Sequence, residues 1–151
     1  MANFKSDLIT AKDQVNISDK MVDGNRLGGL TLYARVEYTL LGTEATSDTI
    51  QLFDLPPQAR LSPGLSFVQS TDPGTTLTLN VGDATSANRY AQGIVLSAGG
   101  QIGFGSGTQP SAVATVYQPA NSTRVVATIA SAATLTPGVK LVFMIGYIIK
   151  G

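Results

Sequence analysis

Four aspartates offer this chain its clearest route to metal chemistry, because carboxylates that meet in space can hold a hard cation such as Ca²⁺. They are Asp48, Asp54, Asp72 and Asp83. None belongs to a D-x-D-x-D-G array, and aspartate more often caps or closes a turn. We therefore expect local structural roles for these carboxylates, and no metal site.

The chain lacks the residues that usually carry out acid–base and nucleophilic catalysis. The chain contains neither His nor Cys, so the ordinary Ser-His-Asp triad cannot be built. A glycosidase needs a pair of carboxyl groups, but Glu37 falls within a predicted strand and Glu44 within a predicted turn. We predict that the protein is not an enzyme and uses no cofactor.

The glycine-rich segment Gly99–Gly107 has a superficial likeness to a phosphate-binding loop. It lacks the G-x-G-x-x-G spacing, a following Lys and a helix whose N-terminus could hold phosphate. It is predicted to be a flexible loop that connects two parts of a sheet.

Asp83 and Arg89 lie six positions apart, at the two ends of a polar segment. At this spacing Asp83 could accept hydrogen bonds from backbone amides or from Arg89. A pair that locks the loop is favoured over a ligand site, since ion pairs that shift pKa values are often structural.

The segments that must position these residues read mainly as β-strands. From Leu30 to Leu40 apolar residues alternate with Thr31, Tyr33, Arg35, Glu37 and Thr39, which is typical of a half-buried antiparallel strand. Further strands are predicted over 49–53, 65–67, 77–81, 94–97, 113–117, 124–130 and 139–149. About eight short strands separated by turn signals indicate an all-β sandwich or barrel.

Two connections and one strand carry further expectations. The turn Asp72-Pro73-Gly74 should return strand 77–81 antiparallel to strand 65–67. Residues 82–90 should form a polar loop, with at most a helical turn. Strand 139–149 is apolar on both faces, so it is either central in a sandwich or covered by a partner.

Residues 1–28 differ from residues 29–151, which are predicted to form the sandwich domain. The first segment is richer in charge, and Phe4, Leu8, Ala11 and Val15 would share one helix face. Val15 and Ile17, however, alternate with polar neighbours as in a strand. The segment is therefore either a first strand with a frayed end or an arm that docks on a neighbouring subunit.

Composition limits the partners. The 151 residues carry a formal net charge of zero, and 13% are charged, against about 25% in typical proteins. No general attraction to nucleic acid or to an anionic membrane is expected, and so uncharged a surface favours association. The sequence shows no secretory signal and no apolar run of the ~20 residues that span a bilayer, so synthesis in a cytoplasm is expected.

Several segments resemble a family of small structural proteins of tailed bacteriophages. They are residues 38–50 (YTLLGTEATSDTI), 55–57 (LPP), 82–83 (GD), 88–90 (NRY) and 142–147 (VFMIGY), so that the resemblance covers residues 29–151. It implies a jelly-roll-like antiparallel β-sandwich that acts as a cement or decoration protein. Such a protein binds the exterior of the capsid, contacts the major capsid protein and bridges capsomers. The family brings no catalytic residues with it.

On this hypothesis the protein also binds itself, as a dimer or trimer. The expected contacts are Phe4, Leu8 and Ile9 of the arm together with the apolar sheet edges. A head-fibre or tail component remains an alternative. A carbohydrate-binding β-sandwich is another, although it would need exposed aromatic and acidic residues on one face, and the chain has no Trp.

Overall fold

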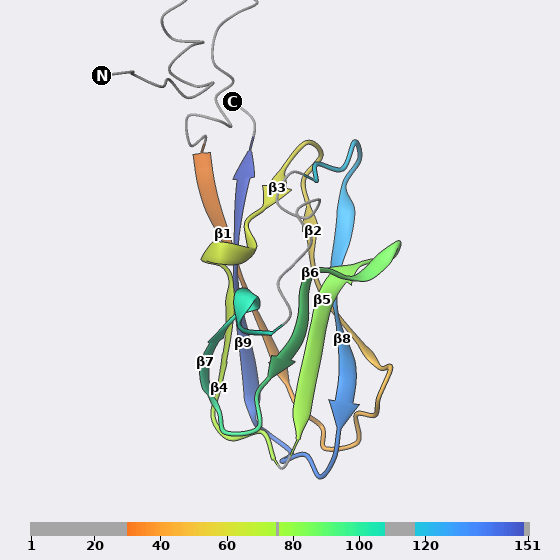
Figure 1. Ribbon diagram of the computed structural model, residues 1–151, viewed down its shortest axis with the longest axis vertical. Coiled ribbons are helices and arrows are strands. Elements are labelled where there is room, and N and C mark those ends of the chain that lie inside the picture. The colour runs from red at the N-terminus through yellow and green to blue at the C-terminus, as the bar shows by residue number, and fades with distance from the viewer. Residues whose placement is uncertain (1–29, 75, 108–116, 150–151) are drawn as a thin grey trace, which may run out of the picture.

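The computed structural model describes residues 30–74, 76–107 and 117–149. These residues form two antiparallel sheets that face each other (Figure 1). One sheet has the strand order β1-β9-β4-β7, with β3 also paired to β9, and the other has the order β2-β8-β5-β6. The strands are β1 (Leu30–Thr39), β2 (Thr49–Leu55), β3 (Arg60–Leu61), β4 (Phe67–Ser70), β5 (Leu77–Asp83), β6 (Ser86–Val95), β7 (Gly100–Gly103), β8 (Thr123–Ala132) and β9 (Lys140–Ile149).

The pairing of the strands is nested. The first strand pairs with the last, β2 pairs with β8, β4 with β7, and β5 with β6. The chain is thus one long antiparallel ribbon that is folded over, so that β4 also pairs with β9 and β5 with β8. Two sheets made in this way from a continuous ribbon are a jelly roll. The predicted all-β, jelly-roll-like sandwich is confirmed.

Strand β1 follows the predicted alternation. Its even-numbered residues from Leu32 to Tyr38 are half-buried, whereas Tyr33, Arg35 and Glu37 are exposed. It pairs with β9 without a break, from Leu30 opposite Ile149 to Thr39 opposite Lys140. The two ends of this part of the chain therefore lie side by side at one end of the sandwich (Figure 1).

The central position of strand β9 in its sheet explains why both of its faces are apolar. It lies between β1 and β4, and its inward residues Leu141, Phe143 and Ile145 are fully buried. These residues join a single core between the sheets, to which every described strand contributes a buried side chain or a partly buried neighbour, Ile102 in the case of the short β7. The largest fully buried members of the core are Tyr90, Phe104, Phe143, Leu40, Leu55, Leu61, Leu77, Leu79, Ile94, Leu96, Ile129 and Leu141.

Three local predictions were wrong. Leu65 is not in a strand but in a short 3₁₀ helix, η2 (Pro63–Leu65), where proline begins the turn. The Asp72-Pro73-Gly74 turn does not make a hairpin. It carries the chain from one sheet to the other, because β5 pairs with β6 and β8 rather than with β4. The glycine-rich segment contains strand β7 and a second 3₁₀ helix, η3 (Phe104–Ser106).

The predicted polar loop 82–90 was also wrong. A two-residue turn at Ala84 and Thr85 joins β5 to β6, and the polar residues Ser86 to Arg89 belong to β6. An edge strand with one solvated face accepts such residues. The predicted strand 113–117 and the predicted arm 1–28 lie outside the described residues, apart from Tyr117.

Candidate interaction surface

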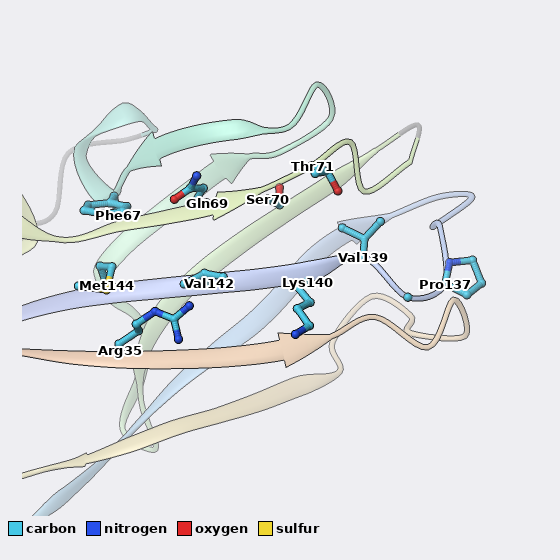
Figure 2. Close-up of a pocket in the computed structure, with 11 residues that line it drawn as sticks. Arg35, Phe67, Gln69, Ser70, Thr71, Pro137, Val139, Lys140, Val142 and Met144 are labelled. Atoms are coloured by element: carbon cyan, nitrogen blue, oxygen red, sulfur yellow. The ribbon is translucent and has the colours of Figure 1, made fainter.

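An apolar stripe crosses the solvent-facing side of the five-stranded sheet, which we call the outer face. The strand register places Arg35 of β1, Met144 of β9 and Phe67 of β4 in one row across it. The next row contains Glu37, Val142 and Gln69. Figure 2 shows the side chains of Arg35, Met144, Phe67, Val142 and Gln69 around the groove on this side of the sheet.

The outer face is hollowed into an open groove of about 810 Å³. Its apolar floor comes from Phe67, Val142 and Met144, and its far end from Pro137, Gly138 and Val139. Gln69, Ser70 and Thr71 supply polar atoms along one side (Figure 2). The half-buried apolar floor is therefore open to a partner that brings apolar side chains of its own.

The opposite side of the groove is charged. Glu37 forms ion pairs with Arg35 at 2.5 Å and with Lys140 at 3.6 Å. The hydrogen bond from Arg35, followed by the charges of Arg35 and Lys140, holds the pKa of Glu37 below its ordinary value. Two cations share one carboxylate, so this side of the groove has an excess of positive charge.

The apolar stripe extends beyond the groove towards the end of the sandwich where β1 begins. Tyr33 is 52% exposed and Leu65 is 44% exposed. Both close over Gly146, which lies opposite Tyr33 in the register. A Cβ atom at Gly146 would lie 2.8 Å from Leu65 Cβ and 3.3 Å from Tyr33 Cε1, so a larger residue would push them apart. Glycine inside a strand often marks such a close approach.

A second polar cluster surrounds the turn between β5 and β6. The structure brings Asp83 and Arg89 together: Arg89 Nε donates to Asp83 Oδ2 at 2.6 Å. Asp83 Oδ1 accepts from the backbone N–H groups of Thr85 and Ser86 and from the Thr85 hydroxyl. The Arg89 guanidinium also lies 3.9 Å from the centre of the Tyr117 ring.

The pKa of Asp83 reports two opposing influences. Burial, the larger single influence, raises it, but the hydrogen bonds from Arg89 and Thr85 together bring the pKa below its ordinary value. Asp83 is 5% exposed, and both of its oxygens have partners within the hairpin. The arrangement can hold the turn, but it offers a ligand no unused carboxylate oxygen.

The other aspartates also have local partners. Asp48 accepts from the Ala45 N–H at 2.8 Å, and Asp72 accepts from the Gly74 N–H at 3.0 Å. Asp54 forms a two-pronged ion pair with Arg124 across β2 and β8. Among the described residues, no group of three or more His, Cys, Asp or Glu could hold a metal ion.

The sequence did not single out the residues of the groove as a site. The apolar pattern on both faces of strand 139–149, which contains Val142 and Met144, was the one available signal. Arg35, Phe67 and Lys140 join them through strand pairings between distant parts of the chain. The predicted contacts Phe4, Leu8 and Ile9 lie outside the described residues. No helix among the residues described is long and apolar enough to cross a membrane.

Comparison with known proteins places this fold among phage capsids. No family model matches the chain, and no curated protein matches it. A chain of the Cyanophage Pam1 capsid asymmetric unit is 26% identical with a TM-score of 0.58, and the match covers 80% of this chain and 86% of that one. The chain is similar to a phage capsid protein.

Two further solved structures share the fold. A chain from the capsid of Ralstonia phage GP4 is 21% identical with a TM-score of 0.62, covering 82% of this chain and 86% of that one. A chain from the acid-stable capsid of Helicobacter pylori bacteriophage KHP30 is 16% identical with a TM-score of 0.53, covering 82% and 90%. In each of the three comparisons the match covers at least 80% of this chain.

Proposed function

We propose that the protein is a structural component of a phage virion, and specifically a cement or decoration protein. It binds the exterior of the capsid, contacts the major capsid protein and bridges neighbouring capsomers. The observation that carries this proposal is the likeness to a chain of the Pam1 capsid at 26% identity over 80% of this chain. The protein is made in the cytoplasm of the bacterial host and acts without catalysis, nucleic acid or membrane.

The outer face supports a binding role of this kind. Its groove combines an apolar floor with a charged side, whereas Asp83 and Arg89 satisfy each other within the hairpin. A protein that engages two capsomers gains from multivalency, because the second contact becomes intramolecular. Binding only to the assembled shell stabilises that shell by mass action.

The arm and the sandwich have separate tasks in this proposal. Residues 29–151 form the sandwich that sits on the shell, and residues 1–28 tether it to a neighbouring subunit. Phe4, Leu8 and Ile9 supply the apolar contacts of the tether. Replacing all three by Ala should weaken binding to shells while leaving the unfolding transition of the sandwich unchanged.

The decisive experiment compares particles with and without the protein. Particles that lack it should rupture at a lower temperature, and adding back the purified full chain should restore the normal rupture temperature. An unchanged rupture temperature would refute the cement role. A cryo-EM map of the parent particle provides the second measurement, because density for this fold in a fibre or tail would identify the protein as a component of that structure instead.

A further inference from the structure

Among the described residues, the strands at the edges of the two sheets are protected to very different degrees. An unprotected edge presents free N–H and C=O groups and invites another strand. Strand β7 has four residues, and the pairings of β2 and β6 contain irregularities of register that disrupt a regular edge. Strand β1 has ten residues in unbroken register with β9, and it contains no proline.

The core is also incomplete beside β1. Ala34, Val36 and Tyr38 point towards the core but are only half-buried. Their register partners on β9, Ile145, Phe143 and Leu141, are fully buried. Among the described residues, no strand lies on the other side of β1 to cover this row of side chains.

The backbone direction shows which residues face the free edge. The Leu40 N–H donates to the Val139 carbonyl at 2.9 Å, and the Leu40 carbonyl accepts from the Gly138 N–H at 2.8 Å. Alternate residues of an antiparallel strand direct their hydrogen-bonding groups to the same side. The even-numbered residues of β1 therefore face β9, and Tyr33, Arg35, Glu37 and Thr39 present their backbone groups to the free edge.

We propose that a second copy of this chain occupies the free edge of β1. The two β1 strands pair antiparallel about a two-fold axis at Val36, which joins two five-stranded sheets into one. In this register Arg35 lies opposite Glu37 of the second copy, and Glu37 lies opposite its Arg35. A two-fold interface requires one patch to complement itself in this way.

The same register also suits the core side of β1. Val36 meets Val36 of the second copy, and Ala34 meets its Tyr38, so apolar residues lie opposite apolar residues on the inner side. Opposite charges placed directly across a strand pair stabilise it, and like charges destabilise it. The proposal specifies the self-association that the sequence analysis expected of a cement protein. The proposal rests on the proposed function only in this respect. Its test uses the isolated protein and needs no capsid.

Charge exchange at Arg35 and Glu37 tests the pairing. The mass of the full chain is measured by sedimentation at rising concentration for the wild type, E37R and R35E. Each single variant places like charges opposite each other twice and should weaken the dimer at least about tenfold. A mixture of the two variants restores both opposite-charge pairs and should form a mixed dimer. R124E, which makes the same change of charge on β8, is the control and should dimerise like the wild type.

Three outcomes would overturn the proposal. They are a wild type that stays monomeric at its highest soluble concentration, a trimeric mass, and single variants that dimerise like R124E. If a single variant does not fold, the double variant R35E/E37R takes its place. It should form dimers with itself but exclude the wild type, because mixed pairs would again oppose like charges. Shell binding by a strictly monomeric wild type would refute this inference and leave the proposed capsid role standing.

Discussion

Arg89 reaches back across the turn between β5 and β6 to hold Asp83, with its Nε 2.6 Å from Asp83 Oδ2. The same guanidinium lies over the ring of Tyr117. Arg89 therefore contacts both the turn of the β5–β6 hairpin and Tyr117, which lies in the segment before β8. The burial of the Asp83–Arg89 pair distinguishes it from the cross-strand ion pair of Asp54 with Arg124, in which both side chains are about half exposed.

Replacing Asp83 by Ala should lower the free energy of unfolding by about 3 kcal/mol, because the change leaves a nearly buried cation without its partner. Urea denaturation followed by circular dichroism provides the measurement. Asp54→Ala is the matched control. It removes a carboxylate that is 52% exposed from the other ion pair, and its effect should be much smaller. Equal losses for the two variants would contradict the role given to Asp83.

The stability of the protein should fall in acid, and Asp83 should contribute to the fall. Its pKa in the folded protein is below the ordinary value of 3.8, so the unfolded chain binds more protons. The contribution is fully present above that ordinary value and is lost as the pH falls through the lowered folded pKa. Denaturation between pH 7 and pH 2 measures it. Asp83→Asn should flatten the acid limb of the curve, and an unchanged slope would contradict this assignment.

Gly82→Ala should prevent the hairpin from closing. A Cβ atom at Gly82 would lie 2.0 Å from the Ser86 carbonyl oxygen and 2.5 Å from the Ala87 carbonyl carbon. Backbone atoms cannot move aside as a flexible side chain can, so we expect a loss of about 3 kcal/mol or more. Gly64→Ala is the control, because a Cβ atom there meets nothing within 4 Å. Thermal melting of both variants tests the difference.

Met144→Glu should weaken binding to capsid shells by about tenfold or more, because it places a charge in the apolar floor of the groove. Arg35 lies opposite in the register and can accommodate the new carboxylate, so the fold should survive. Co-sedimentation with particles that lack the protein measures binding. Val95→Glu changes an exposed apolar residue of the other sheet and should bind normally. If both variants bind equally well, the groove is not the capsid contact.

The sequence predicted the fold best where one face of a strand is buried and the other is wet. Strand β1 was identified because its apolar residues alternate with Tyr33, Arg35 and Glu37. The same logic misassigned Ser86 to Arg89, because these residues occupy the solvated start of an edge strand and read as a loop. Strand β7 was also predicted as a loop, because its residues Gly100 and Gly103 lie in a glycine-rich segment.

The candidate surface depended on information that no local pattern contains. A turn at Asp72-Pro73-Gly74 shows that the chain reverses, but not which sheet receives it. The groove joins Arg35, Phe67 and Met144 across three strands, and only the register brings them together. Asp83 and Arg89 could be paired from the sequence because they lie close in the chain, although the turn between them was misread.

The nested ribbon has a consequence for how the protein acquires its structure. Among the described strands, β5 and β6 are the only paired strands that follow each other in the chain, and a two-residue turn joins them, so this hairpin is the one described pairing that closes a short loop. Every further pair spans a longer stretch of chain and carries a larger closure entropy. Folding of the chain should therefore be slow, as for other topologies dominated by contacts between distant residues. It should start at the β5–β6 hairpin and finish where Leu30 meets Ile149.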